Sequence, residues 1–312
     1  RKAKRKVVIQ ALQAMVNSNK DIRDDESRLF NVMATPGYPE LIGEMVSLNN
    51  DRGLTAFIVG DSPFRLASDG TTISNWGSNT ALAVEDNDNG LVTRDEYLGV
   101  FYPSLFTSDN AGNNVVVPPS HGMLRTLALS DQVSFPWFAP AGTRRGGITN
   151  SSASGFVDAE GEFKSIALNE GQRDTLYSLN INPITFLTGA GLVNYGQKTR
   201  ARNASALDRI NVARLVIYLR SQLKKLAKPY IFEPNDKITR DEIKAQVDSL
   251  MLELVSQRAL YDFLVVCDES NYTPARIDRN ELYVDIAIEP VKAVEFIYIP
   301  LRLKNTGEIA GL

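Results

Sequence analysis

The sequence is poor in the residues that build metal sites and covalent cross-links. It contains one cysteine, Cys267, and one histidine, His121. A single cysteine excludes an internal disulfide framework and a multi-cysteine zinc site, and a single histidine excludes a His-rich metal cluster. No apolar run reaches the roughly 18 residues that a membrane-spanning helix needs. We therefore predict no membrane contact and no resident cofactor.

An excess of positive charge is also missing. The 34 Lys and Arg residues and the 37 Asp and Glu residues give a formal net charge of −3. Proteins that bind nucleic acid usually carry a clear basic excess, so we predict no nucleic-acid partner. The basic cluster at residues 1–6 is interpreted as the solvated end of a helix over residues 2–19.

What remains is an ordinary globular composition, with 43% hydrophobic and 23% charged residues in a chain of 312. That length suffices for about two domains of roughly 150 residues each. The sequence starts at Arg1 without Met and without a signal-peptide pattern, so we expect a fragment or a processed product.

The first half has the pattern of an α/β domain. Residues 28–34 and 55–59 are short apolar segments, and Pro39 between them suits the first turn of a helix. A strand, a short helix and a strand in succession favour parallel pairing through a right-handed crossover. Residues 60–96 and 139–165 are rich in Gly, Ser and Asn, and we predict loops for both.

The second half predicts two long helices, at about residues 207–227 and 239–257. Residues 281–289 then alternate between apolar and polar, which is the period of a half-buried strand. A short link separates them from a second apolar segment at 294–303, so we predict a hairpin. Residues 304–312 are expected to form an exposed tail.

Three segments resemble functional motifs. The run 189–199 is similar to a phosphate-binding loop, but Lys198 is displaced by one position from the pattern. The run 85–96 is similar to a calcium loop but has few well-placed carboxylates. His121 is the one candidate for a catalytic base. We interpret these as a Gly-rich turn, a surface turn and a surface histidine. A hydrolase that is subtilisin-like or nucleotide-dependent is kept as the alternative function, and a monomeric binding module as a third class.

The first long helix carries a basic stripe. Arg214, Lys225 and Lys228 share one side of the helix with Ser221, and apolar residues cover the other side. Such a stripe can dock on an acidic partner surface through complementary charge. A solvated face on a core helix is the other interpretation.

Four segments in order resemble one family, the sheath proteins of contractile phage tails and related injection machines. They are Val116–Gly142 with its paired prolines, Leu179–Thr199 with its Gly-rich strand, Arg209–Asp236 with the exit FEPND, and the closing segment Leu264–Ile299. The resemblance covers residues 97–303 well and residues 28–60 weakly.

This resemblance implies a fold. Residues 1–168 would form a subtilisin-like, three-layer α/β domain without a working triad, with the N-terminal part of the protein missing. Residues 169–312 would form an α+β C-terminal domain with two long helices, a terminal β-hairpin and a C-terminal arm.

The resemblance also implies a function without enzyme activity. The chain would be a structural subunit of the sheath, polymerised as stacked hexameric rings around the tail tube. The sheath would contract to drive the tube through the host envelope during genome ejection. The partners would be further copies, the tail tube protein, and the baseplate and tail terminator proteins. The location would be the contractile tail of the virion, assembled in the host cytoplasm.

Two sets of site residues follow from the resemblance as hypotheses. The set for strand exchange between subunits is Leu282, Val284, Ile286, Phe296, Tyr298, Leu303 and Leu312. The tube-facing set is the basic stripe of Arg214, Lys225 and Lys228.

Overall fold

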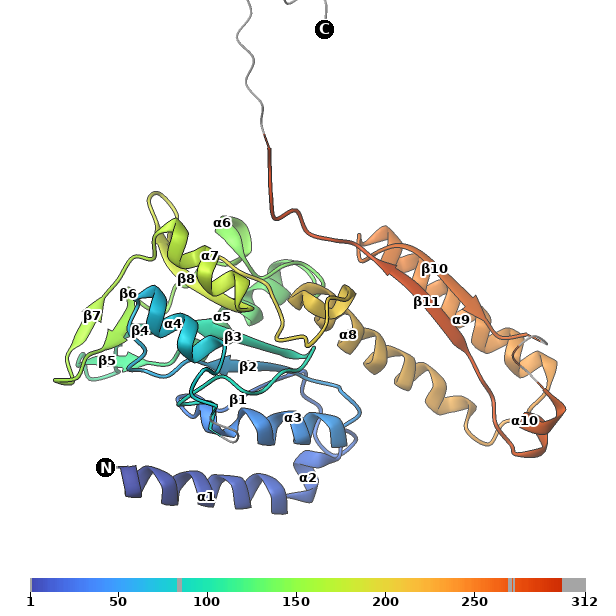
Figure 1. The fold of residues 1–312 in the computed structure, drawn as a ribbon. Coiled ribbons are helices and arrows are strands. Elements are labelled where there is room, and N and C mark those ends of the chain that lie inside the picture. Colours follow the sequence, from blue (N-terminus) through green and yellow to red (C-terminus); the bar gives the residue numbers. More distant parts are fainter. Residues whose placement is uncertain (1, 83–85, 269–270, 272, 299–312) are drawn as a thin grey trace, which may run out of the picture.

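A five-stranded sheet forms the centre of the protein in the computed structural model, which describes residues 2–82, 86–268, 271 and 273–298 (Figure 1). Its strands, in spatial order, are β1 (Val32–Ala34), β2 (Phe57–Asp61), β3 (Leu98–Tyr102), β8 (Ile181–Leu187) and β9 (Gly191–Asn194). The first four are parallel, and β9 is antiparallel to β8. The predicted parallel pairing of the first two strands is confirmed, with α3 (Ile42–Asp51) as the crossover.

Helices cover both faces of this sheet. On one face, α3, α4 (Gly70–Gly77) and α7 (Glu170–Ser178) contribute apolar side chains to a core that includes Ile58 of β2. On the other, α5 (Pro119–Val133) and α8 (Ile210–Ala227) pack against Phe57 and Val59. Successive side chains of a strand point to opposite faces, so a strand covered on both sides is apolar throughout. All residues of β2 and β3 are buried accordingly.

A second sheet of four antiparallel strands lies beside the first. Its order is β5 (Asn114–Val117), β4 (Ser104–Ser108), β6 (Ala153–Val157) and β7 (Phe163–Ser165). The loop predicted for residues 139–165 is therefore wrong, and the loop predicted for 60–96 contains α4. Small residues make β6 hard to recognise in the sequence, but the close approach of β7 requires one of these small residues, Gly155. A Cβ on Gly155 would lie 2.0 Å from the carbonyl oxygen of Lys164.

The remaining helices are short or lie at the edges of the molecule. They are α1 (Lys2–Ser18), α2 (Lys20–Arg23), η1 (Pro39–Leu41), α6 (Gly142–Arg145), η2 (Ala206–Asp208), η3 (Lys228–Tyr230), α9 (Lys237–Ser256) and α10 (Pro274–Asp278). Within the described residues, no helix combines the length and the apolar character that a membrane crossing demands.

The C-terminal unit is built on the second long helix, α9. It packs on a two-stranded antiparallel ribbon of β10 (Leu260–Val266) and β11 (Asp285–Pro290) (Figure 1). Leu215 and Leu219 of α8 join the same apolar core. Because β8 and β9 continue the central sheet, residues on both sides of position 168 share one sheet, and the packing changes along α8 instead.

A buried carboxylate holds three segments of the central unit together. Asp61 ends β2 and is 2% exposed. It accepts hydrogen bonds from the backbone N–H of Gly37 (2.9 Å) and from the N–H and hydroxyl of Ser120 (2.7 and 2.8 Å), in the first turn of α5. Burial raises the pKa of Asp61 to about 6, and these three hydrogen bonds partly offset the rise.

This shift predicts that stability falls as pH rises between about 4 and 6. The folded protein retains the Asp61 proton over a range in which the unfolded chain has lost it, so raising the pH favours unfolding. We expect the free energy of unfolding to lose about 3 kcal/mol from this one group by pH 7, at about 1.4 kcal/mol for each pKa unit. Asp61→Asn should lack this loss. Urea unfolding of both proteins from pH 4 to pH 7 tests it, and a constant difference between them would show that the assignment is wrong.

Candidate functional site

The two-stranded ribbon is the main candidate for contact with other chains. In the described part of the chain, β10 and β11 pair only with each other, so each has an open outer edge. The open edge of a strand presents N–H and C=O groups that a strand from another chain can pair with. Three residues proposed for strand exchange pack partly buried against the α9 core: Ile286 in β11, and Leu282 and Val284 just before it.

The predicted hairpin between residues 281–289 and 294–303 is wrong for the residues that the structure describes. Residues 285–290 do form β11, but their partner is β10, and residues 291–298 are not a strand. Alternation identifies a half-buried strand but does not specify its neighbour. Val265 of β10 completes the apolar layer under α9, so β11 gains buried contacts by pairing there.

Residues 291–298 form an extended segment that we call the arm. It runs from the end of β11 back toward the unit built on the five-stranded sheet, and then turns away from it (Figure 1). Phe296 and Tyr298, two residues proposed for strand exchange, are 69% and 88% exposed. Together with the exposed Val294 and Ile297 they form a run of exposed apolar side chains, which is typical of a contact surface. Leu303 and Leu312 lie outside the described residues.

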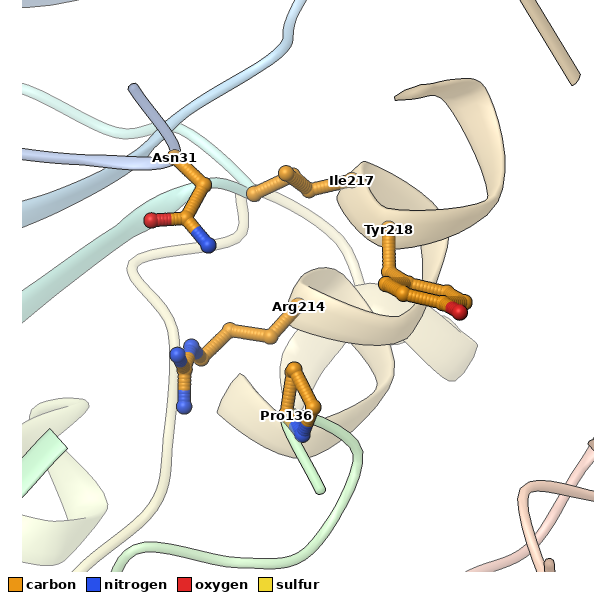
Figure 2. A pocket seen from close by; sticks show the side chains of 5 residues that line it. All are labelled: Asn31, Pro136, Arg214, Ile217 and Tyr218. Atoms are coloured by element: carbon orange, nitrogen blue, oxygen red, sulfur yellow. The ribbon is translucent and has the colours of Figure 1, made fainter. Parts of the chain in front are cut away.

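The structure divides the predicted basic stripe. Lys225 and Lys228 are exposed, but Arg214 is 3% exposed and pairs with Asp131 of α5 at 2.5 Å. Figure 2 shows its side chain leaving α8 toward a small cavity that it lines with Asn31 and Pro136. The expectation that Arg214 is exposed is therefore wrong. The N-terminal half of α8 is packed into two cores, and helical spacing alone does not reveal that a second face is covered.

A groove runs along the C-terminal half of α8. Its volume is about 880 Å³, and it lies between α8, the loop after α2 and the segment after α5. Leu29 and Phe135 supply exposed apolar surface within it. Lys225 and Lys228 line it together with Asp25 and Glu26, and the Lys228 amine lies 3.8 Å from the Glu26 carboxylate.

The residues considered for the alternative hydrolase function are either exposed on the surface or hydrogen-bonded within the protein. His121 is exposed on α5, while the hydroxyl of the preceding Ser120 is buried and donates to Asp61. Gly189, in the turn between β8 and β9, and Gly191, at the start of β9, have positive φ, which agrees with the predicted Gly-rich turn.

Lys198 follows that turn but does not point into it. Its amine donates to the carbonyl oxygen of Tyr177 (2.8 Å) and lies 4.1 Å from the centre of that ring. Burial lowers the pKa of Lys198. Its amine is therefore engaged within the protein.

One cluster of carboxylates escaped the sequence analysis. Glu40, Asp86 and Asp88 place oxygens within 4.8 Å of one another. However, the guanidinium of Arg5 on α1 binds both oxygens of Glu40, at 2.7 and 2.8 Å. The cluster therefore anchors α1. Glu85, the first position of the calcium-like run, lies outside the described residues.

Comparison with known proteins identifies relatives of this chain. Residues 203–304 match the family described as phage tail sheath C-terminal domain. The tail sheath protein of Vibrio phage KVP40 is 39% identical over 199 residues, which is 62% of this chain and 28% of that protein. The tail sheath protein of Enterobacteria phage T4 is 34% identical over 200 residues, 63% of this chain and 29% of that protein. The matches thus span less than a third of these relatives.

Solved structures show the same fold. The anti-feeding prophage baseplate in the contracted state aligns with a TM-score of 0.68 at 20% identity, over 94% of this chain and 80% of that chain. The contracted sheath complex of an extracellular contractile injection system, PVC, aligns with a TM-score of 0.62 at 19% identity, over 80% and 64%. The resemblance to tail sheath proteins and the mixed α/β class are therefore confirmed.

The pair of buried Arg214 and partly exposed Asp131 generates a prediction. Asp131→Ala leaves the guanidinium buried without its counter-charge and should lower the free energy of unfolding by about 3 kcal/mol. The double variant Arg214→Met with Asp131→Ala should recover most of this loss, because no unpaired charge remains. Urea unfolding at pH 7 measures both. Asp174→Ala, which removes an exposed carboxylate of α7, is the control, with an expected change within about 0.5 kcal/mol. An equal loss in the single and double variants would contradict the prediction.

Proposed function

We propose that this chain is a structural subunit of a contractile tail sheath. It polymerises as stacked hexameric rings around the tail tube and contracts to drive the tube through the host envelope. The observation that carries the proposal is a ribbon with open edges beside an arm with exposed aromatic residues, in the region that matches the sheath C-terminal family. These two features are what a chain needs in order to exchange strands with its own copies.

Main-chain pairing suits a sheath that changes shape. Hydrogen bonds between strand backbones give affinity without requiring one fixed orientation of the attached domains. In this proposal, the ribbon containing Ile286 receives a strand, and the arm together with residues 299–312 supplies one to a neighbour. The subunits then rotate as units while the exchanged strands keep them linked.

The wider partners belong to the same proposal. They are further copies of the chain, the tail tube protein, and the baseplate and tail terminator proteins. The location is the contractile tail of the virion, assembled in the host cytoplasm. The finer fold is a subtilisin-like, three-layer domain, and helices on both faces of the central sheet support it.

A structural role without catalysis also belongs to the proposal. It is supported by relatives that are tail sheath proteins, and by the Ser120 hydroxyl, which is buried and donates to Asp61, whereas His121 is exposed. A nucleophile and its base need to lie within hydrogen-bond reach of each other and of a substrate.

The tube-facing surface is proposed at the C-terminal half of α8. Lys225 and Lys228 are exposed there, and Arg214 supports the helix from within. Exposed cations attract an acidic partner surface, and salt weakens the attraction.

Deleting residues 304–312 tests the strand exchange. The truncated protein should remain a folded monomer but should no longer form sheaths, because the donated segment is lost. Negative-stain microscopy measures sheath formation, and thermal unfolding of the monomer provides the control for folding. Sheaths of ordinary length from the truncated protein would refute this role of the tail.

Reversing the charge of the exposed lysines tests the tube-facing surface. Lys225→Glu with Lys228→Glu should reduce co-sedimentation with tubes, because like charges then meet. For the unaltered protein, raising the salt concentration should weaken attachment as well. Lys4→Glu with Lys6→Glu makes the same change in net charge on the exposed face of α1 and should leave attachment unaffected. If the two double variants bind tubes equally well, the surface lies elsewhere.

A further inference from the structure

One charged side chain of the arm, Glu295, binds residues next to the start of α8. Glu295 accepts two hydrogen bonds from the guanidinium of Arg209, from Nε at 2.5 Å and from Nη2 at 3.1 Å. The side-chain amide of Gln197 donates to the same carboxylate at 3.1 Å. A bidentate contact between a guanidinium and a carboxylate fixes direction as well as distance.

The residues that receive Glu295 are held in place independently of the arm. Arg209 is the N-cap of α8 and forms an isolated β-bridge with Lys198. The carbonyl oxygen of Gln197 accepts from the N–H of Ile210 at 2.8 Å. These backbone contacts therefore hold both donor residues in place whether or not Glu295 is bound.

Solvent only partly reaches this contact. The side chains of Arg209 and Glu295 are 29% and 16% exposed. A charged pair shielded in this way is stronger than one on an open surface, yet remains sensitive to salt. The Asp208 carboxylate lies 3.0 Å from Nη1 of the same guanidinium. Arg209 therefore keeps a counter-charge when Glu295 leaves.

The rest of the arm has little to fix it. Val291 is bonded at its base, where its N–H donates to Ala259 (3.0 Å) and its carbonyl oxygen accepts from Asn211 (3.3 Å). Beyond that point, Glu295 makes the side-chain bonds just described. The apolar residues around it are exposed, namely Val294, Phe296, Ile297 and Tyr298.

We propose that Arg209 and Gln197 form a carboxylate-binding site whose ligand is Glu295 of the same chain, and that this site sets the direction in which the arm leaves the body. With Glu295 bound, the arm is fixed at two points, and Phe296 and Tyr298 are presented in one direction. With Glu295 released, the arm pivots at Val291. The use of this site in assembly rests on the proposed function, because the arm then reaches its neighbour along the direction that the site fixes.

The site itself is tested on the unassembled chain of 312 residues. Spin labels are placed at Tyr298→Cys on the arm and Asp174→Cys on α7, both exposed positions, while the native Cys267 is buried. Pulsed electron paramagnetic resonance then gives the distribution of distances between the labels. We expect one narrow population, and loss of that population in Glu295→Gln or at high salt.

Two further variants control this measurement. Glu289→Gln removes an exposed carboxylate from β11 and should keep the narrow population. The charge swap Arg209→Glu with Glu295→Arg should restore a narrow population that either single reversal loses. An identical distribution in Glu295→Gln and the unaltered protein, or a swap that restores nothing, would overturn the assignment.

Microscopy separates the site from the proposed function. If Glu295→Gln loses the narrow population and also forms fewer or shorter sheaths, the site both exists and directs assembly. If sheaths form normally although the narrow population is lost, the directing role is overturned. If the unaltered protein forms no sheaths at all, the proposed function fails, while the resonance measurement still decides whether the site exists.

Discussion

One helix belongs to two hydrophobic cores, and the rest of the structure depends on it. Ile210 and Ile217 of α8 pack under the central sheet, while Leu215 and Leu219 pack under the C-terminal unit. Burial on two sides leaves Arg214 only 3% exposed, so its guanidinium needs Asp131. Leu223 and Leu226 of the same helix pack against the second core, while Lys225 in the last turn is exposed. Packing at one end of α8 therefore positions the charge at the other.

Three arginine–carboxylate pairs connect segments that are far apart in the sequence. Arg5 with Glu40 holds α1, Arg214 with Asp131 joins α8 to α5, and Arg209 with Glu295 holds the arm. Arginine suits these contacts because its planar donors match a carboxylate in a defined orientation. Two of the elements held in this way, α1 and the arm, bury few apolar side chains of their own. In α1, for example, no residue is fully buried.

The ribbon is the structural feature best suited to assembly. Two strands alone are marginally stable in water, and α9 supplies the apolar layer that stabilises them. Added strands from neighbouring chains would pair with the open edges and extend the sheet without disturbing that layer. In the proposed assembly, folding of the monomer would use the inner face of the ribbon, and association would use its outer edges.

The sequence by itself determined the elements that have a clear period. Both long helices lie within a few residues of the predicted ranges, and the alternation of residues 281–289 located β11. Its ordered motifs also identified the sheath relatives, since a resemblance needs no coordinates. Only the tertiary structure decided that β11 pairs with β10, that Arg214 is buried, and that Gln197, Arg209 and Glu295 meet. Periodicity indicates which side of an element is apolar. Its partners are selected by the packing of the whole chain, as the sequence separation of 86 between Arg209 and Glu295 illustrates.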